Sequence, residues 1–318
     1  MYTEQEARRL VIEACHKLVK EKLVARTWGN ISARISSNEL LITPSGRAYE
    51  NLRPEDLVVV RIDDLSYTGD IKPSSEKGIH AEAYKLRSDV NFIIHTHQFF
   101  ASVLAAEGKN TKAAPCAAYG SPGTAKLIRN ISKVLKAYPD DRAFLMSRHG
   151  ALILGTDPED AFARAAGLEA ESKKVFMTRV MKDHSVSDSM ALTNRFGLGA
   201  NYVMLLQDQY VMECCNSGMR LLPYIDDFAQ IAGVDVLCVD NKKDQIKRAL
   251  KGRNAVLVRN LGAVCTGVTR DDAEAVASIV SKNAAAACYV RDPKPLSKIL
   301  AIIERRVYVA KYSKRING

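Results

Sequence analysis

Two histidines stand two positions apart at the end of an apolar run, in the segment NFIIHTHQFF at residues 91–100. Side chains at i and i+2 of a β-strand project from the same face, so His95 and His97 could offer two imidazoles to one ion. A third histidine, His149, follows another predicted strand in SRHGA, and the glycine after it suits a tight turn. Three imidazoles with an open fourth position form a common catalytic zinc arrangement. These histidines are therefore candidate metal ligands, although an HxH pair alone is equally compatible with ordinary strand residues.

A second group of candidate residues lies in KPSSEKGIHAEAYKL, residues 72–86. Ser74 and Ser75 follow a proline and precede a helical pattern, which predicts that they cap the helix. A helix N-terminus that carries hydroxyl groups is also suited to a phosphate or a carboxylate. Glu76 would then be well placed to act as a base beside a cation. His80, about one helical turn further on, is assigned no catalytic role but could support the site residues by contacting them.

Two polar loops complete the candidate site, RTWGNIS at 26–32 and LITPSGRAYE at 41–50. Each carries a glycine between strand or helix signals. Asn30, Ser45 and Gly46 could donate hydrogen bonds to an oxyanion, as anion-binding turns do. Taken singly, each loop is more typical of an ordinary turn.

These residues must be positioned by elements that alternate along the first half of the chain. Periodicity predicts strands at 39–43, 56–62, 91–97, 143–147 and 151–155, and helices at 3–23, 75–87, 98–107, 124–137 and 158–181. Such interleaving predicts an α/β fold with one sheet covered by helices. The short connection between the last two strands makes that pair antiparallel, so we expect a mixed or largely antiparallel sheet.

The second half of the chain contains a repeat of part of the first. AFLMSRHGALILGTDPEDAFARAA (143–166) aligns without gaps on AVLVRNLGAVCTGVTRDDAEAVAS (255–278), and both predict strand, turn, strand and an Asp-capped helix. Leu261 stands where the first copy has His149. We therefore expect a catalytic domain at 1–184, a linker at 185–200, and a degenerate half-domain without metal ligands at 201–318.

The composition narrows the class of protein. The 318 residues are 47% hydrophobic and 26% charged, as in soluble globular proteins, and no apolar run approaches the roughly 20 residues of a membrane span. The N-terminal segment is typical of an amphipathic helix rather than a signal peptide. Seven scattered cysteines without a CxxC pair favour a reducing cytoplasm. The net charge of +10 is spread along helices without interleaved aromatics, which argues against a nucleic-acid partner.

Taken together, TWGNIS, LITPSG, KPSSE, HTH and RHGAL occur in the order and at roughly the spacing of the class II aldolase/adducin family, which includes L-fuculose-1-phosphate aldolase and L-ribulose-5-phosphate 4-epimerase. The resemblance covers residues 4–180. It implies a three-layer α/β/α fold and a Zn2+ ion, or another divalent ion such as Mn2+, Co2+ or Fe2+, held by His95, His97 and His149. It also implies Glu76 as the acid/base, and a homo-oligomer (dimer or tetramer). The phosphate pocket that it implies consists of Asn30, Ser45, Gly46, Ser74 and Ser75.

The activity implied by the resemblance is retro-aldol cleavage of a phosphorylated or anionic sugar through a metal-stabilised enediolate. The family's aldolases carry a catalytic tyrosine after the HxH motif, but QFFASVLAAEGKNTKAA contains none, and Tyr119 is only a nearby substitute. A sugar-phosphate epimerase, dehydratase or decarboxylase on the same metal site therefore stays open. A non-catalytic, adducin-like interaction module is the third alternative, and retention of the three histidines with Glu76 argues against it.

Overall fold

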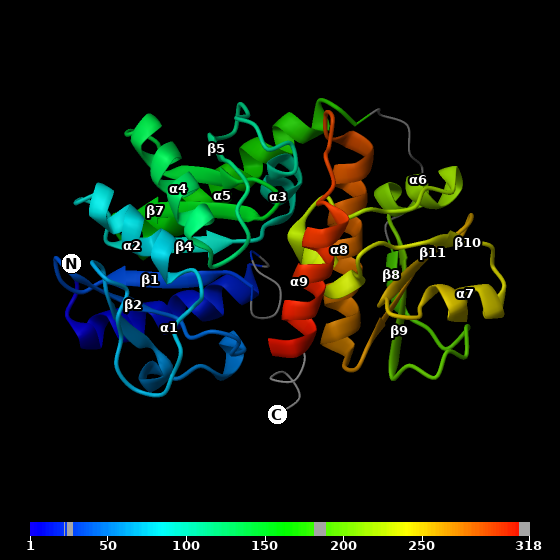
Figure 1. Cartoon of the computed structure of the whole chain (residues 1–318), viewed down its shortest axis with the longest axis horizontal. Helices are drawn as coiled ribbons and strands as arrows, with labels where there is room; N and C mark the ends of the chain where they lie inside the picture. The colour runs from blue at the N-terminus through cyan, green and yellow to red at the C-terminus, as the bar shows by residue number, and fades with distance from the viewer. Residues whose placement is uncertain (22, 24–27, 181–188, 312–318) are drawn as a thin grey trace. The chain divides into compact units, whose positions relative to one another are not determined.

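The computed structural model describes residues 1–21, 23, 28–180 and 189–311 (Figure 1). The chain forms two compact units, one from Met1 to Val175 and the other from Phe176 onward. The expected boundary at residue 184 and the first part of the expected linker lie outside the described residues. Strand β8 (Ser189–Leu192) lies in the part of the expected linker that the structure describes. The domain limits therefore stay predictions.

The first unit is built on a sheet with the strand order β3-β2-β1-β4-β7-β6-β5. All neighbouring pairs are antiparallel except β5 with β6. The prediction of a mixed, largely antiparallel sheet is confirmed. The strands are β1 (Asn30–Arg34), β2 (Glu39–Ile42), β3 (Val58–Arg61), β4 (Phe92–Thr96), β5 (Cys116–Ala117), β6 (Ala143–Met146) and β7 (Gly150–Gly155).

Helices cover both faces of this sheet and make three α/β/α layers, as expected (Figure 1). On one face, Ile79 of α2 and Ile131 of α4 join a core with Ile93 and Leu152 of the sheet. Because side chains alternate along a strand, Ile94 is buried on the opposite face. The helices of this unit are α1 (Glu4–Lys20), α2 (Lys77–Leu86), α3 (Phe99–Ala105), α4 (Ala125–Ala137) and α5 (Pro158–Met177), with short 3-10 turns η1 (Tyr49–Asn51) and η2 (Pro54–Asp56).

The hydrophobic pattern does not predict the short strand β5 or strand β1, and β1 is the one that bears on the site. Its sequence, NISAR, is fully buried although three of its five residues are polar. The Arg34 guanidinium is satisfied by main-chain carbonyls, donating to the oxygens of Tyr84 at 2.7 Å and Val90 at 2.9 Å. β1 lies between β2 and β4, so its polar side chains reach the interior next to the histidine-bearing strand.

The second unit is built on a smaller sheet with the order β10-β11-β12-β9-β8 among the described residues. β10 and β11 are parallel and the other pairs antiparallel. This order and these directions match those of β5, β6, β7, β4 and β1 in the first unit. The elements are β8 (Ser189–Leu192), β9 (Tyr202–Gln207), β10 (Cys238–Val239), β11 (Ala255–Val258), β12 (Gly262–Gly267), α6 (Gln209–Ser217), the π-helical turn η3 (Phe228–Ala232), α7 (Lys243–Ala249), α8 (Arg270–Tyr289) and α9 (Lys298–Lys311).

The hairpins of the two sheets correspond residue by residue. Met146 pairs with Gly150 at the tip of the first, and Val258 with Gly262 at the tip of the second. Both turns contain a non-glycine residue with positive φ, Arg148 at 60° and Asn260 at 56°. The same register therefore extends through the whole repeat.

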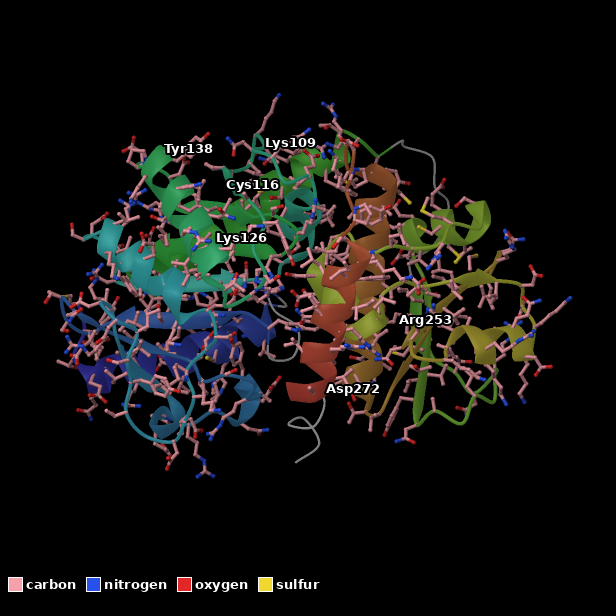
Figure 2. The ribbon with its side chains drawn as sticks, viewed as in Figure 1. Lys109, Cys116, Lys126, Tyr138, Arg253 and Asp272 are labelled. Atoms are coloured by element: carbon pink, nitrogen blue, oxygen red, sulfur yellow. The ribbon has the colours of Figure 1, made fainter. Side chains whose placement is uncertain are left out.

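The helix after the second hairpin starts differently from the prediction. Its N-cap is Thr269 and not an aspartate: the Thr269 hydroxyl accepts a hydrogen bond from the Asp272 amide, and the Asp272 carboxylate accepts one from the Thr269 amide. The position of Asp272 is labelled in Figure 2. This reciprocal capping box satisfies two amide groups that the first helical turn would leave unpaired. In the part of the chain that the structure describes, no helix is long and apolar enough to cross a membrane.

Candidate metal and acid–base site

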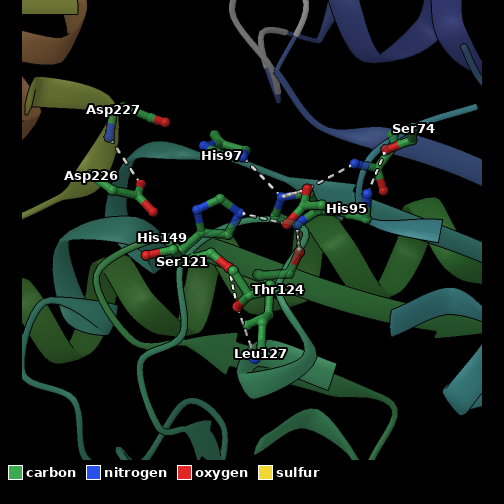
Figure 3. Close-up of polar contacts among 12 residues, drawn as sticks. Ser74, His95, His97, Ser121, Thr124, Leu127, His149, Asp226 and Asp227 are labelled. Carbon is green, nitrogen blue, oxygen red and sulfur yellow. Dashed lines mark hydrogen bonds and ion pairs between the residues drawn. The ribbon is translucent and has the colours of Figure 1, made fainter. Parts of the chain in front are cut away.

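The first unit brings the three predicted histidine ligands to one point. His95 lies on β4 opposite Leu152 of β7, and His97 directly follows the end of β4. His149 occupies the turn between β6 and β7. The three ring centroids are 4.6, 4.7 and 4.8 Å apart, and all three side chains are buried (Figure 3).

The glycine after His149 is required by a close approach of two strands. A Cβ atom at Gly150 would overlap the main-chain oxygen of Thr96 and would lie 3.2 Å from Cε1 of His95. The left-handed conformation of Arg148 turns the chain just before His149. The hairpin of β6 and β7 therefore places the turn with His149 directly beside the end of β4.

The nitrogen atoms of the cluster fit a divalent metal ion. One ligand nitrogen from each ring lies within 4.8 Å of the other two, and His95 Nε2 is 2.9 Å from His97 Nε2. Two nitrogens bound to a tetrahedral ion at zinc distances would be about 3.3 Å apart. The separation between His95 Nε2 and His97 Nε2 is slightly shorter than this value and the other nitrogen pairs lie within 4.8 Å, so the group could hold a metal ion after small side-chain shifts.

The protonation of His95 also suits a metal ligand. Its Nδ1 lies 2.8 Å from the main-chain oxygen of Ala151, which can only accept, so Nδ1 carries the hydrogen and Nε2 presents its lone pair to the cluster. Burial lowers the pKa of His95 to about 3, and the nearby Glu76 carboxylate only partly offsets this. The ring is neutral at pH 7, as a metal ligand must be.

Glu76 is the acidic residue that faces this cluster. Its Oε1 lies 3.1 Å from His149 Nε2, and its Oε2 lies 3.3 Å from His95 Nε2. The Asn30 amide donates a hydrogen bond of 2.9 Å to Oε2. Burial would raise the pKa of Glu76, but the adjacent imidazoles of His95, His149 and His97 outweigh this effect and lower it. The carboxylate is therefore ionised at neutral pH.

The loops that carry the predicted anion-binding residues lie side by side. The Ser45 amide donates to the Lys72 main-chain oxygen at 2.9 Å, and the Ser74 amide donates to the Thr43 oxygen at 3.0 Å. These bonds bring Ser45 and Gly46 next to Ser74 and Ser75. Asn30 differs from them, because its amide is directed to Glu76.

The prediction that Ser74 and Ser75 cap α2 is wrong. The N-cap residue of α2 is Glu76, and its side chain makes no capping hydrogen bond. The Ser74 hydroxyl instead accepts a hydrogen bond of 3.2 Å from the amide of Glu76, the residue directly before the first residue of α2 (Figure 3). Ser74 is buried and Ser75 is exposed. The helix start thus fixes the backbone of Glu76 and leaves its carboxylate available to the histidines.

Two further residues lie near the site: Arg148, which was not considered from the sequence, and Tyr119, which was named there only as a nearby substitute for the family's tyrosine. The Arg148 guanidinium lies over the Tyr119 ring, 5.7 Å from its centroid. The loop that contains Tyr119 and Gly123 also approaches the loop that carries Ser74 and Ser75 (the serine loop), because a Cβ atom at Gly123 would lie 3.0 Å from the Ser75 main-chain oxygen. The positive charge of Arg148 directly before His149 was visible in the sequence, but its position beside Tyr119 depends on the fold.

Comparison with known proteins identifies the family of the first unit. Residues 9–173 match the Class II Aldolase and Adducin N-terminal domain. An L-fuculose phosphate aldolase from Methanocaldococcus jannaschii is 28% identical over 182 residues, 54% of this chain and 96% of the relative. A 5-methylthioribulose-1-phosphate/5-deoxyribulose-1-phosphate aldolase from Rhodospirillum rubrum is 33% identical over 171 residues, 50% of this chain and 75% of the relative.

A solved structure supports the same assignment. An L-fuculose 1-phosphate aldolase superposes with a TM-score of 0.51 at 28% identity, over 54% of this chain and 86% of that chain. The matching half contains the convergent histidines and Glu76. The chain belongs to the class II aldolase and adducin family.

Proposed function

We propose that the first unit is a metal-dependent aldehyde-lyase that cleaves a phosphorylated or otherwise anionic sugar by a retro-aldol reaction. The observation that carries this proposal is the convergence of three buried imidazoles beside the ionised carboxylate of Glu76. The names of two relatives, which are aldolases of sugar phosphates, support the substrate class.

His95, His97 and His149 would hold a zinc ion or another divalent ion. When bound there, such an ion supplies Lewis-acid polarisation of the substrate's carbonyl and hydroxyl oxygens. Neutral imidazoles suit this role, because they leave the positive charge of the ion undiminished. The hydrogen bond from His95 Nδ1 to Ala151 fixes the orientation of one ligand before the ion arrives.

Glu76 would move the proton in this reaction. Retro-aldol cleavage breaks a carbon–carbon bond, removes a proton from the hydroxyl group that becomes the aldehyde, and returns a proton to the carbon left behind. A single carboxylate that is ionised at the start can take the first proton and return it in the second step. Its position at the start of α2 holds it beside the cluster while the substrate changes.

The serine loops would bind the anionic end of the substrate. Ser45 and Gly46 lie on one loop and Ser74 and Ser75, which directly precede Glu76, lie on another; main-chain hydrogen bonds join the two loops. Asn30 would border this pocket through its contact with Glu76. We also propose a cytoplasmic homo-oligomer. The seven free cysteines agree with a reducing compartment.

Substitution of the carboxylate tests the role of Glu76. Glu76→Gln should lower kcat by about 10²- to 10⁴-fold, the usual contribution of a general acid–base group, while bound metal measured by mass spectrometry stays near the wild-type amount. Glu82→Gln, on the same helix but away from the histidines, is the matched control and should retain activity. Turnover that survives in Glu76→Gln would rule out this role.

The choice of reaction is tested with a panel of phosphorylated ketoses. An aldolase should release dihydroxyacetone phosphate and an aldehyde such as lactaldehyde, each detectable with a coupling enzyme. An epimerase would instead return a sugar phosphate of unchanged length. Metal-loaded protein that converts substrate without releasing an aldehyde would exclude the aldolase and leave another reaction on the same site.

A further inference from the structure

A chain of buried polar side chains leads away from Glu76 into the space between β1 and α2. The Asn30 amide nitrogen donates to Glu76 Oε2 at 2.9 Å, and the Asn30 amide oxygen lies 2.5 Å from Nε2 of His80. The other ring nitrogen of His80, Nδ1, is 2.7 Å from the hydroxyl of Ser32. His80 and Ser32 have no exposed surface, and Asn30 is 4% exposed.

The directions of these contacts fix one set of hydrogen positions along the chain of polar side chains. A carboxylate oxygen only accepts, so the Asn30 NH2 group faces Glu76 and its carbonyl oxygen faces His80. Nε2 of His80 must then carry the hydrogen, and Nδ1 accepts from the Ser32 hydroxyl. The Tyr84 hydroxyl lies 2.9 Å from Ser32 Oγ and donates to the Ser32 main-chain oxygen at 3.0 Å.

Packing alone does not account for a histidine at this place. The neighbouring Ile79 and Ala83 of α2 belong to the hydrophobic core, and an aliphatic residue at position 80 would avoid the cost of burying an imidazole. Burial lowers the pKa of His80 to about 4, so the ring is neutral at pH 7 with one donor and one acceptor nitrogen. A neutral ring is what this chain of hydrogen bonds requires.

The second sheet gives an internal comparison. Asn30 pairs with His95 across β1 and β4, and Ala191 occupies the matching position opposite Leu205. The described residues between β8 and β9 form no helix, so Glu76 and His80 have no counterpart there. The chain of polar side chains is present in the first unit, next to Glu76, and is absent from the described part of the second unit.

We propose that His80 is a positioning residue for the reaction assigned above, acting through Asn30: its Nε2–H holds the Asn30 amide so that the NH2 group points to Glu76. The contact occupies Oε2 of the carboxylate. We assign proton exchange with the substrate to Oε1, which lies 3.1 Å from His149 Nε2 and so faces the histidine cluster. The inference rests on the proposed function for its catalytic consequence, but the orientation of the chain can be measured without turnover.

Two isosteric substitutions separate the two nitrogens of His80. In His80→Gln the side-chain amide can replace Nε2–H, and in His80→Asn it can replace only the Nδ1 position. His80→Asn should lower kcat by about 10- to 100-fold with little change in KM or metal content, as losses behind a catalytic group usually do. His80→Gln should stay within about threefold of wild type. Exposed His16 provides the control His16→Gln. Equal losses of kcat in His80→Gln and His80→Asn would overturn the proposal.

Nuclear magnetic resonance of the full-length protein provides a readout that does not depend on activity. Spectra of protein labelled with 15N at histidine should show His80 neutral at pH 7, with its hydrogen on Nε2. A hydrogen on Nδ1 would refute the proposal even if both variants lost activity. If the wild-type protein cleaved no sugar phosphate, the proposed function would fail. The His80 tautomer would still decide whether the hydrogen bonds from His80 through Asn30 are directed toward Glu76.

Discussion

The two units use the same five-strand arrangement, but among the described residues only the first sheet carries a cluster of three histidines that could hold a metal ion. When the strand registers of the two sheets are matched, the second sheet has Leu205, Gln207 and Leu261 at the positions of His95, His97 and His149. The turn geometry is retained, with Arg148 and Asn260 both at positive φ. The difference indicates that the backbone of the hairpin does not depend on its role as a ligand carrier.

The surroundings of the two sheets differ as well. In the first unit β2, β3 and α2 extend the five shared strands and supply the serine loops, Glu76 and His80. In the described part of the second unit the sheet ends at β8, whose side chains are exposed. The proposed site thus draws on both the shared sheet and the additional elements beside β1.

Exchanging the residues at the hairpin tips would give the largest effect. His149→Leu places the second unit's residue in the first turn and should abolish metal binding and reduce activity by more than about 100-fold, because removal of a ligand costs more than the loss of its supporting contacts. Metal content by mass spectrometry and turnover with the best substrate would measure this.

The reciprocal variant, Leu261→His, sharpens the same comparison. It should add no bound metal, because Leu205 and Gln207 contribute no imidazoles beside it. A second equivalent of metal in Leu261→His would contradict the assignment of the second sheet as lacking a site. Wild-type activity in His149→Leu would contradict the ligand set of the first.

The glycines after the two tips should give effects of intermediate size. A Cβ atom at Gly150 would overlap the Thr96 oxygen, and one at Gly262 would overlap the Leu206 oxygen. Each alanine variant should lower the free energy of unfolding of its own unit by about 1–3 kcal/mol, as overpacking does. Gly150→Ala should also weaken metal binding, because His149 moves with the turn, whereas Gly262→Ala should leave metal content unchanged. Urea unfolding and metal analysis would distinguish the two, and equal metal loss would contradict the comparison.

Lowering the pH should destabilise the first unit through the shifted pKa of His80. Burial lowers the pKa of His80 to about 4 from an ordinary value of 6.5. Between these values the unfolded chain binds a proton at His80 and the folded chain does not, so the free energy of unfolding falls as the pH falls. At about 1.4 kcal/mol per pH unit, the loss from pH 7 to pH 5 is about 2 kcal/mol.

Urea unfolding at both pH values would measure this contribution. His80→Gln should lose about 2 kcal/mol of the pH dependence seen in wild type, whereas His16→Gln should retain it. An unchanged pH dependence in His80→Gln would show that the buried ring does not set the response of the first unit.

Hydrophobic periodicity predicted most of the first sheet, because strands such as β4 and β7 are continuous apolar runs. It failed at β1, where Asn30, Ser32 and Arg34 point inward and are stabilised by hydrogen bonds rather than by apolar contacts. The pattern of a buried polar strand cannot be distinguished from that of a loop without its partners.

The candidate site was predictable to a similar degree. The HxH spacing and the turn at His149 indicated that the three rings could meet, since both features follow from local geometry. The contacts of Asn30 with Glu76 and His80 were not predictable, because they depend on the register between β1 and β4. The capping prediction for Ser74 failed because the helix begins two residues later than the serine pattern indicates.

The matching hairpin tips have an evolutionary consequence. Since both turns adopt the same backbone course with histidine in one and leucine in the other, a duplicated copy can gain or lose a ligand by point substitution, without insertion, deletion or refolding of the loop. Three codon changes, at positions 205, 207 and 261, would recreate an imidazole cluster in the second sheet. Such a cluster would lack a counterpart of Glu76, because the described residues between β8 and β9 form no helix like α2. It would need an acidic side chain in the place of Glu76 before it could act on sugars as proposed for the first unit.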